Sequence, residues 1–330
     1  MSDLAQRIAE ETEVQPLEEA AAVLPKFPEP ERILKSQEII REALVKARRA
    51  CIAFSGGRDS LVLLKLVAGQ MPSPLFKQPP VVIYADSQME YPESREYIEK
   101  TVASFGLTLR IGKANVKPIE QWERHGWPLL GKMPARIWNK QNKTAGFLLN
   151  CSECCRNMKI KPARRVARNL GIGVQMTGQR GGQDDQLRAH RERSDGPIKY
   201  QQRDKMWIAN PLINWKDEEI KGFIQEHNLP EHPATKRGES NFGCVFCGGG
   251  SAFINSQYSR LRKTWPEAWA RFMVTYQVGI IILAVKYKTD LQETTAAVSE
   301  LGGLRKLAED RPWIFDYTRI TPIRPIKKSG

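Results

Sequence analysis

The stretch of residues 51–64 constrains the fold of this chain more than any other part of its sequence. A short apolar run at 51–54 leads into the small residues 55–57, and an apolar pattern with helical spacing starts directly after them. This pattern predicts a strand, a tight loop and a helix. Glycine lets a backbone approach a ligand closely, and the start of a helix leaves N–H groups without intrahelical acceptors. The loop therefore predicts a binding site for an anion such as phosphate.

The side chains of this loop favour a nucleotide over a structural turn. Ser55 and Ser60 add hydroxyl donors, whereas Asp59 either caps the helix or faces a metal ion. The pattern G-x-x-x-x-G-K-[ST] is missing, which excludes a Walker A loop. An ordinary Gly-Gly turn between strand and helix remains the structural alternative.

The rest of the chain predicts an α/β fold with a parallel twisted sheet and helices on both faces. Helices are expected to alternate with the strands, and ligands collect at the carboxyl ends of such strands. Asp86 follows the second strand, where it either meets the nucleotide or a metal ion, or caps the next helix. We expect strands at 51–54, 81–85, 107–111, 172–176 and 206–209, and helices at 31–49, from 61 onward, and at 91–105, 159–170 and 216–227.

Three domain ranges are expected. Residues 1–29 are acidic and then proline-rich, which predicts a loose arm, and residues 30–250 hold the nucleotide-binding domain. Residues 251–330 predict a helical extension, with helices at 256–287 and 290–308. Within the central domain, 113–150 is expected to be irregular and 178–204 to be a long hydrophilic loop.

Charge and hydropathy restrict the partners. Of the 330 residues, 51 are Lys or Arg and 37 are Asp or Glu, so the net charge of +14 favours an anionic partner, with nucleic acid first. An inert basic surface is the alternative. The N-terminus has no apolar core, and the longest apolar run, 272–285, is too short to cross a bilayer. We therefore expect a cytoplasmic protein with no membrane partner.

Tryptophans and bases are interleaved between residues 113 and 150. Trp122, Trp127 and Trp138 lie among lysines and arginines. Such a pattern either stacks and tracks a single strand of nucleic acid, or marks a covering subdomain with buried tryptophans.

The cysteines form two groups that predict a metal centre. In a reducing compartment thiols serve as metal ligands or catalytic groups more often than as disulfides. Cys154 and Cys155, with Cys151 close by, precede a basic helix, and Cys244 and Cys247 form a C-x-x-C; Cys51 lies in a strand and is expected to be core. Two thiol groups from distant segments can close one four-thiolate site, which suits zinc or a [4Fe–4S] cluster.

The motif Ser-Gly-Gly-x-Asp-Ser at 55–60 resembles the PP-loop of the N-type ATP pyrophosphatases, which cleave ATP between the α and β phosphates. The resemblance implies an adenine nucleotide α-hydrolase-like fold, with ATP and Mg²⁺ as cofactors. It assigns nucleotide binding to the PP-loop residues and to Asp86, Gly178 and Gln179, and catalysis to Ser55, Asp59, Ser60 and Arg180. The PP-loop residues in this assignment are Ser55, Gly56, Gly57, Arg58, Asp59 and Ser60.

Other segments resemble the assimilatory adenylyl-sulfate reductases of the phosphoadenosine-phosphosulfate-reductase-like superfamily. The pair Cys154-Cys155, followed by Lys159 and Pro162, and the later C-x-x-C match the segments that hold a [4Fe–4S] cluster there. Residues 178–180, Gly-Gln-Arg, resemble that family's Gly-x-Arg loop near the nucleotide; Arg180 then contacts phosphate, or alternatively DNA. The likeness covers roughly 50–250 and favours the cluster over zinc, with ligands Cys154, Cys155, Cys244 and Cys247. Cys151 either replaces Cys154 or carries sulfur as a persulfide.

One departure redirects the functional prediction. The reductases use a nucleophilic cysteine near their C-terminus, whereas no cysteine follows Cys247 in this sequence. The pattern resembles instead the sulfur-insertion branch, the DNA phosphorothioation proteins of Dnd and Ssp type. That resemblance implies adenylation of the DNA backbone, with a cysteine desulfurase and other phosphorothioation subunits as partners. The alternatives are tRNA thiolation by the same chemistry, a sulfonucleotide reductase, and a nucleic-acid-binding subunit without activity.

Overall fold

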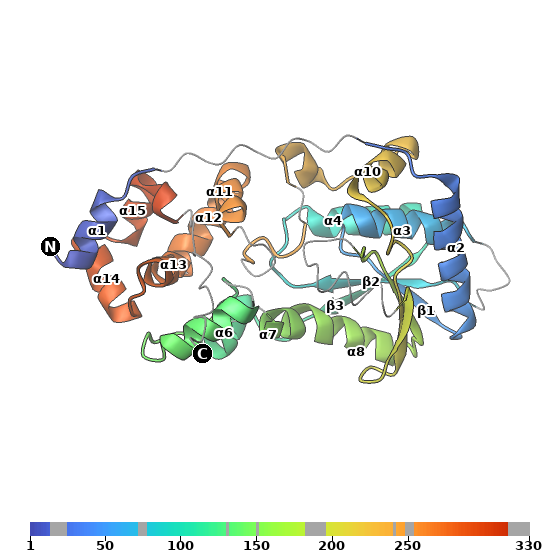
Figure 1. Ribbon diagram of the computed structural model, residues 1–330, viewed down its shortest axis with the longest axis horizontal. Helices are drawn as coiled ribbons and strands as arrows, with labels where there is room; N and C mark the ends of the chain where they lie inside the picture. The colour runs from blue at the N-terminus through green and yellow to red at the C-terminus, as the bar shows by residue number, and fades with distance from the viewer. Residues whose placement is uncertain are drawn as a thin grey trace, which may run out of the picture. The chain divides into compact units, whose positions relative to one another are not determined.

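The computed structural model describes residues 1–13, 25–71, 78–129, 132–149, 152–181, 196–239, 242–247 and 254–315. The chain divides into two compact units (Figure 1). The sheet unit comprises residues 20–115 and 158–244, and the helical unit comprises 1–19, 116–157 and 245–330. These units are discontinuous in sequence, whereas the sequence analysis expects contiguous domains over 1–29, 30–250 and 251–330. The contiguous ranges remain a prediction.

The sheet unit contains, within its described residues, a six-stranded sheet in the order β3-β2-β1-β4-β6-β5. All neighbouring strands are parallel except β5, which runs antiparallel to β6. The predicted α/β fold with a mainly parallel sheet is thereby confirmed. The strands are β1 (Ala50–Ala53), β2 (Val81–Asp86), β3 (Thr108–Lys113), β4 (Val174–Thr177), β5 (Ile198–Gln201) and β6 (Met206–Ala209).

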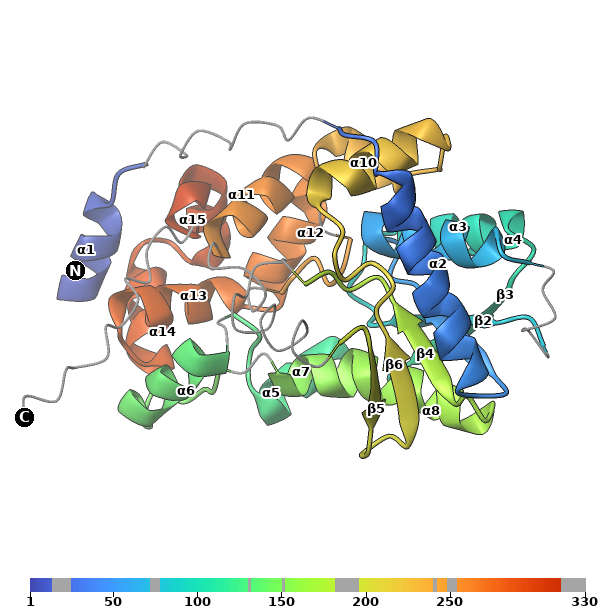
Figure 2. The same ribbon diagram turned by 45° about the vertical axis from the view of Figure 1, so that its right-hand side comes forward.

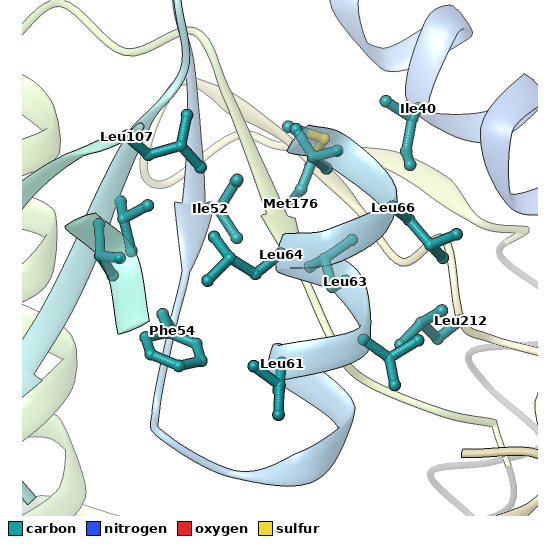
Figure 3. Packing of buried hydrophobic residues seen from close by; sticks show 14 of the residues in the cluster. Ile40, Ile52, Phe54, Leu61, Leu63, Leu64, Leu66, Leu107, Met176 and Leu212 are labelled. Atoms are coloured by element: carbon teal, nitrogen blue, oxygen red, sulfur yellow. The ribbon is translucent and has the colours of Figure 1, made fainter. Parts of the chain in front are cut away.

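Helices cover both faces of this sheet, as predicted. Side chains alternate along β1, so Ile52 joins the large core on one face while Cys51 joins a smaller cluster on the other. The first face carries α2 (Pro30–Val45), α3 (Arg58–Ala68), α4 (Ser94–Ser104) and α10 (Asp217–Glu226), and the second carries α8 (Lys161–Asn169). Figure 3 shows Leu61 and Leu64 of α3 beside Ile52 and Phe54, which fixes the helix that follows the PP-loop.

The close packing of α8 depends on a glycine in β3. A Cβ added at Gly112 would lie 2.7 Å from the carbonyl carbon of Pro162, a separation that side chains do not tolerate. Gly112 therefore lets the start of α8 approach the carboxyl end of β3.

Strand β5 corrects the prediction that 178–204 is one long loop. Ile198–Gln201 pairs with β6, with Tyr200 opposite Trp207. The strand is short and half polar, so its sequence resembles a loop, and only pairing with β6 reveals it. Residues 182–195 of the predicted loop lie outside the described residues.

The helical unit contains three departures from the sequence prediction. Residues 1–29 include α1 (Asp3–Glu10), which buries Leu4 and Ile8 against other parts of this unit, so the arm is not loose there. Residues 113–150 include helices and are not irregular throughout. The predicted helix at 256–287 is broken at Pro266. The predicted helix at 290–308 is broken at Gly302 and Gly303, whose φ angles are +92° and +95°.

The remaining helices are α5 (Pro118–His125), α6 (Lys132–Gln141), α7 (Ser152–Cys155), α11 (Ile254–Thr264), α12 (Pro266–Ala270), α13 (Val278–Tyr287), α14 (Leu291–Glu300) and α15 (Leu304–Asp310), with π-helical turns at Arg156–Ile160 and Arg271–Thr275 and 3-10 turns at Pro233–Arg237 and Pro312–Phe315.

Within the described residues, no single helix has the length and apolar composition of a membrane span. One bent pair, Pro266–Thr275 with Val278–Tyr287, meets that criterion jointly, with an angle of 72° between its halves. All residues from Val278 to Val285 are buried, so α13 is the core helix of its own unit.

Candidate active site

The PP-loop connects β1 to α3 and has the compact conformation that its glycines permit. Gly56 has φ +80°, and Gly57 is the N-cap residue of α3. The Ser60 hydroxyl donates to the carbonyl oxygen of Gly57 at 2.8 Å and lies 3.3 Å from the hydroxyl of Ser55. Ser55 is exposed at the rim while Ser60 is buried. The first N–H groups of α3 point out of the helix start, which is the geometry that binds phosphate.

The loop after β4 forms the second wall of this site. A Cβ added at Gly178 would lie 2.8 Å from the carbonyl carbon of Asp59 and 2.8 Å from the amide nitrogen of Ser60. Only glycine lets the end of β4 come this close to the first turn of α3. Gln179 follows, and its N–H donates to the Thr177 hydroxyl at 3.4 Å.

Arg180 joins these two walls electrostatically. Its Nε lies 3.0 Å from Oδ1 of Asp59, and its Nη2 donates to Oδ1 of Asp217 at 3.2 Å. Only 11% of the Arg180 side chain is exposed. Asp217 also pairs with Lys221 at 3.1 Å. The sequence prediction did not identify Asp217, which the helix pattern indicated only as a first-turn residue of α10.

Both loops lie at the point where the strand order of the sheet reverses. From β1 the chain proceeds outward through β2 and β3, whereas β4 lies on the other side of β1 and leads to β6 and β5. The carboxyl ends of β1 and β4 therefore border the crevice in which parallel α/β sheets bind ligands. The predicted residues Ser55–Ser60 and 178–180 come together there, within one unit.

Two other predicted residues have structural partners. Arg58 forms an ion pair with Glu231 at 2.8 Å. Asp86 accepts a hydrogen bond from the Gln88 N–H at 2.9 Å and lies 3.8 Å from Arg95. Asp86 thus closes the turn after β2 and does not cap α4. Its contact with a nucleotide remains a prediction.

Cys244 lies at the carboxyl end of β2. Its Sγ is 3.0 Å from the hydroxyl of Ser87, which itself donates to the carboxylate of Glu90. Ser87 is fully buried. The first cysteine of the C-x-x-C therefore lies in the same row of loops as the PP-loop.

Comparison with known proteins identifies the family. Residues 49–249 match the model of the phosphoadenosine phosphosulfate reductase domain. The chain belongs to this domain family. The superfamily predicted from the PP-loop and cysteine motifs is thereby confirmed.

Curated relatives in this family are named phosphoadenosine 5'-phosphosulfate reductase. The relative from Photobacterium profundum is 26% identical over 211 residues, which cover 64% of this chain and 72% of that protein. The relative from Thiocapsa roseopersicina is 28% identical over 197 residues, 59% and 70% of the two chains.

Solved structures resemble the chain more distantly. The phosphoadenylyl-sulfate reductase from Candida auris, in a phosphate complex, has a TM-score of 0.45 at 21% identity and covers 67% of this chain and 97% of its own. The U34-tRNA thiolase NcsA from Methanococcus maripaludis, with its [4Fe-4S] cluster, has a TM-score of 0.43 at 14% identity. The match covers 74% of this chain and 78% of the thiolase chain.

The cysteines do not form a complete ligand set within the described part of the chain. There, no three His, Cys, Asp or Glu side chains converge as ligands of a metal ion. Cys154, Cys155 and Cys247 belong to the helical unit, whereas Cys244 is the last residue of the sheet unit. Cys151 lies outside the described residues. The four-thiolate centre therefore remains a prediction.

Cys51 is a core residue, as predicted. It is fully buried between β1 and α8, and burial raises the pKa of its thiol to about 12. A thiol with so high a pKa is a poor nucleophile and a poor metal ligand.

Two tryptophans of the helical unit, Trp122 and Trp138, are packed inside it. Trp122 is fully buried, 5.5 Å from Trp127 and 5.8 Å from Phe272 between ring centroids. Trp138 is 4% exposed and packs against Phe147. The covering-subdomain interpretation is therefore correct for these side chains, and stacking of Trp122 and Trp138 on nucleic acid is wrong, because neither ring has a free face.

His232 anchors the segment that leads to the C-x-x-C and was missed by the sequence analysis. Its Nδ1 accepts the Ala234 N–H at 3.1 Å, so the neutral ring carries its proton on Nε2 and donates to the Ser94 hydroxyl at 2.9 Å. The ring is 2% exposed and stacks on Phe242. Burial lowers the pKa of His232 to about 4, with opposing contributions from the charges of Glu93 and Arg237.

This arrangement predicts a loss of stability in mild acid. Because the pKa of His232 falls from its ordinary 6.5 to about 4 on folding, the unfolded state binds the proton first. Above pH 6.5 His232 is neutral in both states and the free energy of unfolding is at its full value. As the pH falls to about 4, this free energy declines by up to about 3 kcal/mol, because the unfolded state takes up the proton. Urea unfolding at pH 7.5 and 5 should show this loss, and a His232→Gln variant should lose less between the two pH values. Equal pH dependence of the two proteins contradicts the assignment.

A groove of about 490 Å³ lies elsewhere in the sheet unit, between α2 and the loop after β6. Its lining includes Arg32, Ser36 and Trp215, and none of the predicted site residues. The Trp215 indole N–H donates to the Ser36 hydroxyl at 2.8 Å, which ties the two walls together. The groove is therefore separate from the PP-loop site.

Proposed function

We propose that this chain is an ATP pyrophosphatase that adenylates the DNA backbone for sulfur insertion. The observation that carries the nucleotide part is the convergence of the two loops. Gly178 abuts the backbone of Asp59 and Ser60, and Arg180 lies 3.0 Å from Asp59. Helix N–H groups, two hydroxyls and a guanidinium lie at the carboxyl ends of β1 and β4, and these groups suit a polyphosphate.

The proposed reaction follows from these groups. The N–H groups of the PP-loop and the hydroxyls of Ser55 and Ser60 hold the β and γ phosphates as the leaving pyrophosphate, with Mg²⁺ neutralising charge. A backbone oxygen of DNA attacks the α-phosphorus, and the bond to pyrophosphate breaks. Sulfur at the sulfide oxidation level then takes the place of that oxygen, which leaves with AMP. A cysteine desulfurase supplies the sulfur as a persulfide, a thiol reductant contributes the two electrons that bring it to the sulfide level, and other phosphorothioation subunits complete the system.

The DNA part of the proposal is supported by charge and by sequence. The net charge of +14 favours a polyanionic substrate, and residues 248–330 contain no cysteine that resembles the nucleophile of the reductases. The proposed cluster ligands are Cys154, Cys155, Cys244 and Cys247, with Cys151 as the alternative to Cys154. Iron and sulfide analysis of anaerobically purified protein tests them.

The second candidate is reduction of a sulfonucleotide, which the names of the curated relatives favour. It requires a thiol partner and releases sulfite. Thiolation of tRNA shares the adenylation step and differs only in the nucleic acid that stimulates it.

The test is incubation of the full chain with ATP and Mg²⁺, with DNA, tRNA or neither. We expect AMP and pyrophosphate, with DNA increasing their rate of formation. Ser55→Ala and Asp59→Ala should each lower this rate at least about tenfold, because they remove a hydroxyl and the partner of Arg180. Ser104→Ala, at the end of α4, is the control and should leave the rate of AMP formation unchanged. Absence of AMP under all three conditions contradicts the proposal, and sulfite release from phosphoadenylyl sulfate favours the reductase.

A further inference from the structure

Helix α8 carries a stripe of bases on its solvent side. Lys161, Arg165 and Arg168 recur at helical spacing and are exposed, and residues 156–170 contain no acidic residue. We define these three as the α8 stripe. A rise of 1.5 Å per residue separates their Cα atoms by about 6 and 4.5 Å along the axis. Phosphates of one DNA strand follow each other at about 3.4 Å along the duplex, so a strand that lies along α8 presents several of them to the stripe.

Two bases of this stripe have no partner among the residues that the structure describes. Helix α8 continues directly from α7 and the π-helical turn at Arg156–Ile160, so Lys161 lies inside a longer helix whose first turn holds Glu153. Within the described part of the chain, neither Lys161 nor Arg168 has a hydrogen bond or ion pair. Exposed bases without a partner in the protein are available to bind an external anion.

The other bases of α8 have structural partners, which sets them apart from Lys161 and Arg168. Arg164 pairs with Asp204 at 2.8 Å. Arg165 donates to the carbonyl oxygen of Lys113 at 2.8 Å and also contacts Asn115, so it both belongs to the stripe and holds β3. Asp204, the nearby acid, is therefore already neutralised.

The basic surface extends to the edge of the sheet. In β3, Arg110 pairs in register with Ile83, whose side chain belongs to the cluster under α8, so Arg110 projects from the same face. Arg110 is exposed, and β3 is an edge strand. Figure 1 shows α8 along the face opposite to α3 and α4.

The direction of α8 connects this surface to the PP-loop edge of the sheet. The helix starts against Gly112, at the carboxyl end of β3. The helix (α8 in Figure 2) ends at Asn169. The carbonyl oxygen of the next residue, Leu170, accepts from Arg49, which directly precedes β1 at its amino end. A polyanion that follows the stripe from Arg168 to Lys161 therefore arrives at the edge where the two phosphate-binding loops lie.

We propose that the α8 stripe, together with Arg110, is the surface that binds the phosphodiester backbone of DNA. This inference rests on the proposed function and specifies where its substrate lies. The α2 surface offers the contrast, because the exposed Arg41 and, just after the helix, Arg48 lie close in sequence to the acids Glu31, Glu38 and Glu42.

The experiment compares Lys161→Glu/Arg168→Glu with Arg41→Glu/Arg48→Glu, which changes the charge equally on the opposite face. Fluorescence anisotropy of the full chain with a labelled 30-base-pair duplex is measured between 50 and 300 mM salt. We expect the α8 variant to bind at least about tenfold more weakly at 0.1 M salt. Its slope of log affinity against log salt should be smaller by about 2, since each phosphate contact contributes about 0.9. The α2 control should stay within about threefold of wild type.

The outcomes separate this inference from the proposed function. If DNA stimulates AMP formation by the wild type and both variants bind DNA equally, the α8 surface is wrong and the proposed function stands. If the wild type neither binds DNA nor responds to it, both fail. Tighter binding of tRNA than of duplex, lost in the α8 variant, overturns DNA as the occupant. If the glutamate variant has a lowered melting temperature, Lys161→Gln/Arg168→Gln is used, for which the expected losses are the same in direction.

Discussion

Gly178→Ala should abolish most ATP turnover although it adds a single methyl group. The new Cβ would lie 2.8 Å from the backbone of Asp59 and Ser60, and backbone cannot move aside as a flexible side chain can. The first turn of α3 must shift, which we expect to destabilise the protein by about 2 kcal/mol. A displacement of about 1 Å in a phosphate-binding loop lowers turnover roughly 100-fold. AMP formation and the affinity for a fluorescent ATP analogue are the measurements.

Gly173→Ala is the matched control at the other end of β4. Its Cβ would lie 2.6 Å from the Cβ of Ala47, so it also creates overlap, but at the amino end of the strand. Both variants should have lower melting temperatures. Only Gly178→Ala should lose ATP affinity and turnover, measured at a temperature where both are folded. Equal losses in the two variants would mean that Gly178 acts through stability alone.

Arg180→Ala should weaken ATP binding about 100-fold. The substitution removes a cation that lies between the carboxylates of Asp59 and Asp217, at 3.0 and 3.2 Å. The phosphates then lose a charged partner and face two carboxylates that Arg180 no longer neutralises, and both effects oppose an anion. Arg180→Lys should fall between wild type and Arg180→Ala, because it keeps the charge without the planar fork.

The same variant distinguishes the two predicted roles of Arg180. If Arg180 contacts ATP, isothermal titration with a non-hydrolysable analogue shows the loss while DNA affinity is unchanged. If it contacts DNA, the reverse holds. Lys221→Ala, which removes the other partner of Asp217, is the control and should change ATP affinity less than about threefold.

Much of the sheet unit was predictable, because its signals are local. The run at 51–54, the Gly-Gly turn and the apolar pattern from Leu61 each depend on neighbouring residues, and the structure has β1, the PP-loop and α3 in those places. The prediction that Cys51 is core holds for the same reason. In contrast, α1 and β5 are short and partly polar, and they form because the tertiary structure gives each a partner. The sequence left open whether Trp122 and Trp138 are buried or bind nucleic acid, and their packing against Phe272 and Phe147 in the tertiary structure shows that they are buried.

The candidate site divides along the same line. The residue types that contact phosphate were evident from the order Ser-Gly-Gly-Arg-Asp-Ser, since a glycine loop before a helix has few other uses in this context. The partners of those residues could not be predicted, because Arg180 meets Asp59 and Asp217, and Arg58 meets Glu231, across long sequence separations.

The sequence by itself determined the family, the PP-loop and the alternation of strands and helices, because each is written in residues that follow one another. The tertiary structure alone decided that Gly178 must be a glycine, that His232 anchors the segment leading to Cys244, and that the α8 stripe shares its face of the sheet with Arg110. These features depend on which strands are neighbours and on which face each side chain projects, and chain order does not specify either.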